Sequence, residues 1–152
     1  MSQDPAQSVL AAVRAELPGI AASATDVDRL GAVDPGVLGR LADAGYFGLL
    51  QPTSFGGLEA DPDDYLTATR ELSKACTSTG WLAGMFGVAN WHLALFDVRA
   101  QGDVWESDPN ALLSTSYAPT GRLEKVDGGY LMSGQWHHCT GVMHAVCPLT
   151  EA

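Results

Sequence analysis

The sequence is poor in positive charge and in cysteine. Eight Lys and Arg stand against 18 Asp and Glu, which gives a formal net charge of −10. Because nucleic acids and anionic membrane surfaces attract basic proteins, this balance disfavours both as partners. The three cysteines are an odd number without a C-x-x-C pair, which argues against a secreted disulfide scaffold. We therefore expect a cytoplasmic protein that binds neither nucleic acid nor membranes.

The sequence also lacks a signal peptide and an uninterrupted membrane span. Asp4 precedes the first basic residue, and no apolar signal segment follows it. Residues 75–96 carry no charge over a length that could cross a bilayer, but three glycines, Asn90 and His92 interrupt them. We expect this stretch to be a helix buried within the protein. No G-x-G-x-x-G follows a predicted strand, so a dinucleotide-binding βαβ unit is not expected.

The remaining composition is that of a folded protein, since 46% of the 152 residues are hydrophobic. Up to residue 108, apolar residues recur at helical spacing. Pro18-Gly19 is expected to end the first helix, whereas Asp34-Pro35 and Asp61-Pro62 each combine an N-cap with a proline at the first helical position. The pattern predicts helices over residues 9–17, 20–30, 35–44, 62–76, the uncharged stretch and 99–105.

After residue 110 the pattern changes to that of strands. Residues 112–117 form one predicted strand, and residues 123–126 and 130–133 flank Asp127-Gly128-Gly129, a strong hairpin signal. Residues 135–146 are expected to continue as a strand. This order indicates an α+β fold, with an all-helical domain over residues 1–109 and the truncated start of an antiparallel β-domain over residues 110–152. Since so few strands are marginally stable alone, we expect the chain to be the front of a longer protein.

Two groups of polar residues lie in apolar surroundings. His92 falls on the same helical side as Val88, Leu95 and Phe96. An imidazole there suits a general base or a hydrogen-bond donor to a phenolate, and a core histidine bonded to a backbone carbonyl is the alternative. Residues 114–116, with the sequence Ser-Thr-Ser, end a predicted strand. Their hydroxyls fit either the polar edge of a ligand or a plain Ser/Thr-rich strand edge.

A third group contains His137, His138, Cys139, His144 and Cys147. Its spacing matches no closed zinc pattern, and adjacent residues on a strand point to opposite faces. We therefore expect no metal site. No partner motif surrounds any cysteine, so a cysteine nucleophile is not expected either.

Six segments carry a resemblance to a known family: GYFGLLQP (45–52), FGGL (55–58), CTSTGW (76–81), NWHLALF (90–96), STSYAP (114–119) and VDGGYL (126–131). They resemble the N-terminal helical domain of the acyl-CoA dehydrogenase superfamily. Within it, they are similar to the oxygenase components of two-component flavin-dependent aromatic monooxygenases, which include seco-steroid and hydroxyphenylacetate hydroxylases. The resemblance covers residues 6–145.

This resemblance implies a helical domain, a middle β-domain and a C-terminal helical bundle, in an enzyme that is commonly a homo-oligomer. It implies that reduced FMN or FAD is supplied by a separate flavin reductase. Oxygen then forms a flavin C4a-hydroperoxide, which hydroxylates a phenolic small molecule ortho to its hydroxyl. In such enzymes the flavin supplies the oxygen chemistry and the protein supplies position and hydrogen bonds.

The resemblance also implies roles for individual residues. His92 matches the histidine that binds or deprotonates the phenol, and Thr140 matches a hydroxyl residue facing flavin N5, so these two are the expected catalytic residues. The chain departs from the family at His138, where an aromatic residue is usual, and at Pro148, which interrupts an apolar strand. The expected substrate-binding residues are Trp91, His92 and Ser116, and the expected flavin-binding residues are Ser114, Ser116, Tyr117, His138 and Thr140.

Two alternatives stay open from the sequence. One is an FAD-dependent acyl-CoA dehydrogenase, which requires a catalytic carboxylate that the family supplies from the C-terminal bundle. The Asn-Trp-His segment and the Ser-rich strand end favour the hydroxylase over it. The other is a truncated, non-catalytic domain that acts by association with a related subunit, through an apolar face left uncovered.

Overall fold

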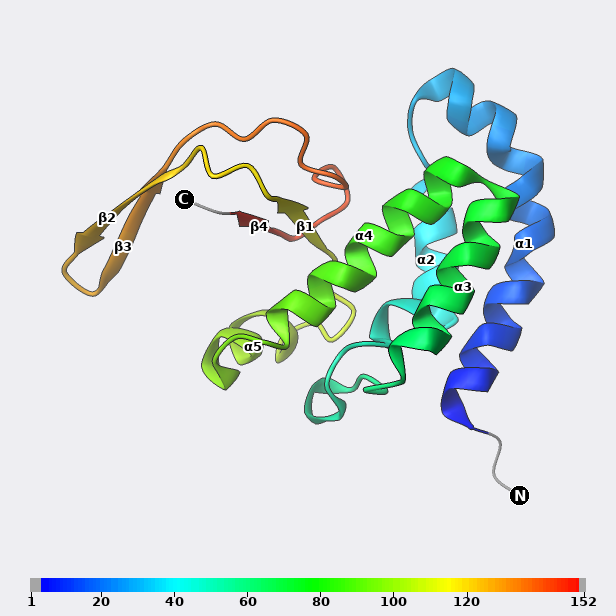
Figure 1. Ribbon diagram of the computed structural model, residues 1–152, viewed down its shortest axis with the longest axis horizontal. Coiled ribbons are helices and arrows are strands. Elements are labelled where there is room, and N and C mark those ends of the chain that lie inside the picture. Colours follow the sequence, from blue (N-terminus) through cyan, green and yellow to red (C-terminus); the bar gives the residue numbers. More distant parts are fainter. Residues whose placement is uncertain (1–3, 151–152) are drawn as a thin grey trace.

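The computed structural model describes residues 4–150, and for residues 147–150 it describes the backbone alone. Helices form the first part of the chain and strands the second (Figure 1). The helices are α1 (Pro5–Leu30), α2 (Pro35–Asp43), α3 (Pro62–Ala75), α4 (Thr77–Leu93) and α5 (Val98–Trp105), with short 3₁₀ helices η1 (Tyr46–Gly48) and η2 (Thr53–Phe55). The strands are β1 (Leu113–Ser116), β2 (Arg122–Val126), β3 (Gly129–Ser133) and β4 (Cys147–Thr150).

Three helices begin at the same Asp-Pro signal. In each, the aspartate side chain accepts a hydrogen bond from the amide two residues later, and the proline occupies the first turn, where no amide partner is lost. The predicted starts of α2 and α3 are therefore confirmed, and α1 begins in the same way. The bonds are Ala6 N to Asp4 (3.0 Å), Gly36 N to Asp34 (2.7 Å) and Asp63 N to Asp61 (2.9 Å).

Helix α1 corrects the expectation that Pro18-Gly19 ends a helix, because it continues through Pro18 to Leu30. Val13 and Ile20, on either side of the proline, are both completely buried. Pro18 itself lies on the exposed side, where the carbonyl that loses its amide partner is open to water. Burial on both sides of the proline therefore outweighs one missing hydrogen bond. The helix ends instead at Gly31, whose φ of 66° is left-handed.

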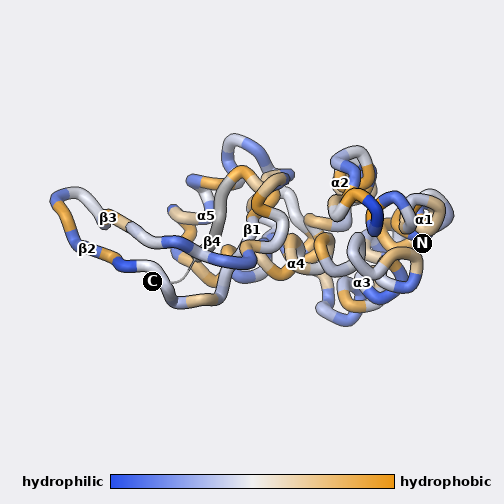
Figure 2. Tube along the Cα trace, turned by 90° about the horizontal axis from the view of Figure 1, so that it is seen from above, coloured by the Kyte–Doolittle hydropathy of each residue, from blue (hydrophilic) through white to orange (hydrophobic). Residues whose placement is uncertain are grey.

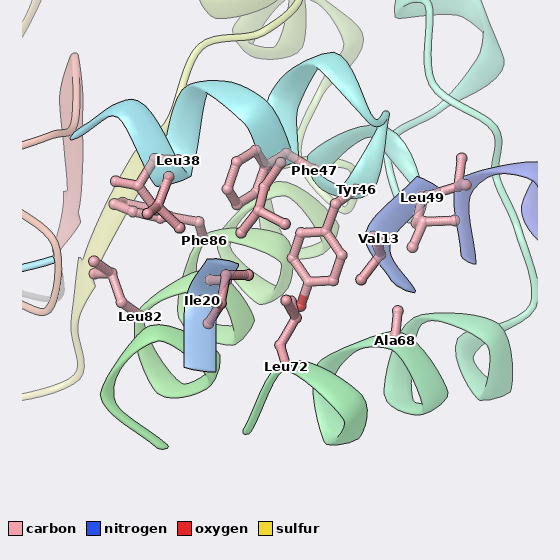
Figure 3. Packing of buried hydrophobic residues seen from close by; sticks show 14 of the residues in the cluster. Val13, Ile20, Leu38, Tyr46, Phe47, Leu49, Ala68, Leu72, Leu82 and Phe86 are labelled. Carbon is pink, nitrogen blue, oxygen red and sulfur yellow. The ribbon is translucent and has the colours of Figure 1, made fainter. Parts of the chain in front are cut away.

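The helical core lies between α1, α2, α3 and α4. Figure 3 shows Tyr46 from η1 inside this core, with its hydroxyl pointing toward α3. That hydroxyl lies 2.6 Å from Thr69 Oγ1, and Thr69 in turn donates to the carbonyl of Tyr65. Thr69 has no second proton to give, so Tyr46 is the donor. Burial of the ring raises the pKa of Tyr46 well above its ordinary value near 10.

A second, smaller core connects the end of the helical part to the first strand. It contains Ala89 and Leu93 of α4, Trp105 of α5, and Leu113 of β1, all buried. Because this cluster packs β1 against the C-terminal half of α4, it fixes where the end of the strand lies relative to that helix.

The strands form two separate pairs. β2 and β3 are the antiparallel hairpin that the sequence predicts, with Val126 opposite Gly129 at the turn. Every residue of this hairpin is exposed, and it projects from the end of the molecule opposite α1 (Figures 1 and 2). β1 pairs with β4, and this pairing is parallel, with Leu113 opposite Cys147. Of the two pairings between named strands, only that of the hairpin is therefore antiparallel.

Residues 135–146 do not form the expected continuous strand. A single antiparallel bridge joins Thr140 to Thr115, and a turn follows over residues 141–144. His138 (φ 60°) and Gly141 (φ 83°) both have left-handed backbone, which interrupts an extended chain. An added Cβ at Gly141 would collide with the ring of Phe86, so the turn also needs glycine for space. In the part of the chain that the structure describes, no helix has the length and apolar character needed to cross a bilayer.

Candidate functional site

The C-terminal half of α4 presents the first two candidate residues. Asn90 is 1% exposed, and its side-chain amide donates to the carbonyl of Phe47 at 2.9 Å. This buried bond fixes the rotation of the helix. The next residues along the chain then lie toward the surface, Trp91 at 44% exposure and His92 partly buried. The buried face of α4 therefore holds the helix, and the Trp-His pair is left accessible.

His92 is joined to the end of β1. The Tyr117 hydroxyl lies 3.1 Å from His92 Nδ1, and the two rings meet edge to face with centroids 5.6 Å apart. The ring of Trp91 lies on another side of His92, with centroids 5.3 Å apart. The structure thus brings together three predicted site residues from two elements. The alternative of a core histidine bonded to a backbone carbonyl does not describe this contact.

The hydroxyls of β1 are buried near this pair, Thr115 on one face of the strand and Ser114 and Ser116 on the other. Ser114, Thr115 and Ser116 are each at most 4% exposed. Ser114 accepts from the Cys139 thiol at 3.3 Å, and Ser116 donates to the carbonyl of His137 at 3.4 Å. Thr115 Oγ1 is buried and has no hydrogen-bond partner. A buried hydroxyl without a partner costs stability.

The loop after the hairpin brings the last two candidates to the same strand. Thr140 pairs with Thr115 by a backbone bridge and is partly buried. His138 is exposed, and its ring lies 6.5 Å from that of His137. Positive φ at a non-glycine residue such as His138 is uncommon and frequently accompanies a functional site.

Thr140 also lines a groove that the sequence did not predict. This groove has a volume of about 390 Å³ and lies between the turn after α1, the start of α4 and the loop at residues 139–144. Trp81, which is 64% exposed, forms one wall. The turn after α1 is remote in sequence from all predicted site residues, so only the packing of α1 against α4 shows that it lies here. The lining includes Val33, Trp81, Leu82, Thr140, Val142 and His144.

The predicted residues therefore fall into two groups along β1. One group contains Trp91, His92 and Tyr117. The other lies on β1 itself and in the loop after the hairpin, and it contains Ser114, Ser116, His138 and Thr140. Among the described residues, no hydrogen bond or ring contact joins the first group directly to Thr140. Likewise, no three His, Cys, Asp or Glu side chains in the described part lie close enough together to hold a metal ion, and the Cys147 side chain is outside that part.

Comparison with known proteins identifies the family of this chain. The N-terminal domain family of acyl-CoA dehydrogenases matches residues 4–104. The oxygenase subunit HsaA of a flavin-dependent monooxygenase from Mycobacterium tuberculosis is 48% identical over 145 residues, which are 95% of this chain and 37% of the relative. The crystal structure of HsaA from M. tuberculosis superposes with a TM-score of 0.92 at 47% identity, covering 95% of this chain and 40% of that one.

A second relative is the oxygenase component of an FADH2-dependent resorcinol hydroxylase from Rhizobium. It is 43% identical over 115 residues, which are 76% of this chain and 28% of the relative. The chain thus spans less than half the length of the relatives it matches. Both relatives are oxygenase components of flavin-dependent enzymes, as the sequence resemblance implies. The chain belongs to the acyl-CoA dehydrogenase N-terminal domain family, and its relatives within that family are the oxygenase subunits of flavin-dependent monooxygenases.

Proposed function

We propose that this chain provides the N-terminal part of an oxygenase that hydroxylates a phenolic small molecule ortho to its hydroxyl, using oxygen and reduced flavin from a separate reductase. The observation that carries the proposal is His92, held at an accessible position by Tyr117 near the buried hydroxyls of β1. The identity to monooxygenase oxygenase subunits supports this reaction over acyl-CoA dehydrogenation. A reaction that consumes reduced flavin fits a reducing cytoplasm.

The residues around β1 fit a flavin. The hydroxyls of Ser114 and Ser116, which share one face of β1, offer hydrogen bonds to a polar heterocycle. Ser114, Ser116, Tyr117, His138 and Thr140 are the residues that would hold reduced FMN or FAD, and Thr140 is the one assigned to flavin N5. When bound, reduced flavin would supply the two electrons that activate O2, one atom of which is transferred to the substrate while the other leaves as water. The strands after residue 109 would belong to a β-domain, and the helices before it to a separate N-terminal domain, in a homo-oligomer.

His92 provides the acid–base chemistry at the substrate. A phenol that loses its proton, or whose oxygen is held as phenolate, has higher electron density at the ortho carbon, which favours attack on an electrophilic oxygen. An imidazole can do either, by accepting the phenol proton or by donating a hydrogen bond to the phenolate. Trp91 and Ser116 are proposed to hold the substrate ring and its hydroxyl near His92.

A chimaera tests the proposal. The 145 aligned residues of M. tuberculosis HsaA are replaced by those of this chain, and product formation from a phenol panel is measured with reduced flavin and oxygen. We expect hydroxylation coupled to flavin oxidation. We expect His92→Ala to lower product formation at least about 100-fold and to increase hydrogen peroxide release, since losing a donor to a reacting oxyanion costs about 10²–10³-fold.

The matched control is His137→Ala, since the His137 side chain has no assigned role and is exposed. It should retain hydroxylation. A chimaera that folds and binds reduced flavin but hydroxylates no phenol would contradict the proposed reaction. Equal coupling in the His92→Ala and His137→Ala variants would contradict the role of His92.

A further inference from the structure

The contact between His92 and Tyr117 has a consequence for the chemistry of the imidazole. We propose that Tyr117 is a positioning residue whose hydroxyl donates to His92 Nδ1 and thereby holds the neutral imidazole in the tautomer with its proton on Nε2. The inference rests on the proposed function, in which His92 meets the phenol oxygen. It assigns Tyr117 a role toward the histidine in addition to the expected one toward flavin.

The geometry supports a specific bond rather than a chance contact. The Oη to Nδ1 distance of 3.1 Å is within hydrogen-bonding range, and the rings are nearly perpendicular at 88°. Tyr117 directly follows β1, and β1 packs on α4 because Leu93 of α4 and Leu113 of β1 share one buried cluster. Within the described part of the chain, this is the one hydrogen bond found for the His92 side chain.

The chemistry of the two groups sets the direction of the bond. A neutral imidazole has one N–H and one basic nitrogen lone pair, while a phenol has an acidic O–H and an oxygen whose lone pairs are partly delocalised into the ring. The stronger combination places the phenolic O–H as donor and the imidazole nitrogen as acceptor. Nδ1 then carries no proton, so the proton of the ring is on Nε2.

This tautomer selects between the two roles of His92 toward a phenol. A neutral ring with its proton on Nε2 can donate to an oxygen at that nitrogen but cannot accept a proton there. The residue therefore binds and stabilises a phenolate oxygen, rather than removing the phenol proton through Nε2. Tyr117 has a role in the reaction even though its hydroxyl is directed at another side chain.

The test uses the 152-residue chain itself, without flavin or substrate. The chain is labelled with ¹⁵N, and imidazole signals are recorded at about pH 8.5, above the ordinary histidine pKa near 6.5. The His92→Gln variant assigns the His92 signals by their loss. We expect His92 to have its proton mainly on Nε2, and Tyr117→Phe to lower the ratio of this tautomer to the other about fivefold, as loss of an ordinary hydrogen bond would.

Tyr130→Phe is the matched control, because Tyr130 is 67% exposed and lies on the projecting hairpin. It should leave the His92 tautomer unchanged. A wild-type His92 with its proton on Nδ1 would overturn the proposal, and so would a tautomer ratio that Tyr117→Phe does not alter. Because neither flavin nor phenol takes part, the result is independent of whether the proposed hydroxylation is correct.

Discussion

Tyr46 shows how a single residue links the core to the pH dependence of stability. Its ring is completely buried, and its hydroxyl donates to Thr69 at 2.6 Å. Burial raises its pKa, and the nearby Tyr65 raises it further. In the unfolded chain the phenol ionises near pH 10, whereas in the folded chain it stays neutral to higher pH. The unfolded state therefore gains stability above pH 10 and the folded state does not.

We expect the free energy of unfolding to depend on Tyr46 in opposite ways below and above pH 10. Below pH 10, Tyr46→Phe should destabilise by about 1 kcal/mol, because the bond to Thr69 is lost. Above pH 10, the wild type should lose about 1.4 kcal/mol per pH unit relative to the variant. The two stabilities should therefore cross near pH 11, as measured by urea unfolding. A difference that stays constant through pH 11 would contradict this account.

At the same scale, the sequence can suggest individual site residues, but it does not show the contacts between them. His92 and Tyr117 both carried expected roles, but 25 positions separate them, and nothing in a single sequence shows that α4 and the end of β1 pack together. Thr115 was only part of a Ser/Thr cluster until its buried hydroxyl proved to have no partner. Trp81 and the turn after α1 were missed as groove residues because their proximity depends on tertiary packing.

Among the helices, the close approach of α3 and α4 depends on glycine. Gly80, Gly84 and Gly87 recur at helical spacing on the face of α4 that meets α3. An added Cβ at Gly80 would lie 2.5 Å from both Cα and N of Ser73, closer than such atoms approach in proteins. Since a backbone cannot move aside as a flexible side chain can, the two helices would have to separate.

We expect Gly80→Ala to lower the free energy of unfolding by about 2 kcal/mol, the usual cost of overpacking. Gly39→Ala is the control, because Gly39 lies inside α2 with no atom within 4 Å of an added Cβ. This change should be neutral or stabilise by up to about 1 kcal/mol, since alanine favours the helix. Urea unfolding compares the two variants, and a Gly80→Ala protein as stable as Gly39→Ala would refute the close-approach argument.

The elements themselves were largely predictable where local signals agree with packing. Asp34-Pro35, Asp61-Pro62 and Asp127-Gly128 marked their helix starts and hairpin turn correctly, because capping and turn formation depend on neighbouring residues. The prediction failed at Pro18, where burial of both helix halves outweighs the local break. It failed again over residues 135–146, where left-handed backbone at His138 and Gly141 replaces a strand.

Across the whole molecule, stability is expected to be uneven. Helices α1 to α4 share one core, whereas every residue of β2 and β3 is exposed. A two-stranded hairpin alone is marginally stable. We expect hairpin amides at residues 122–133 to exchange with deuterium at least about 100-fold faster than buried amides of α3 and α4, measured by mass spectrometry. Equal protection of the two regions would show that the hairpin is supported by contacts beyond its own ladder.

The parallel pairing of β1 with β4 determines the order in which the chain folds. Joining these strands closes a loop over residues 117–146, which costs about 3 kcal/mol of chain entropy by the usual logarithmic dependence on loop length. The ladder between β1 and β4 has only four residue pairs, so it contributes little stabilising free energy to offset this cost. The β2–β3 hairpin lies within this loop and its contacts are local, so it can form before the loop closes. We therefore expect the hydroxyls of β1 and the loop bearing Thr140 to come together after the hairpin has formed, so the proposed flavin-binding residues assemble late.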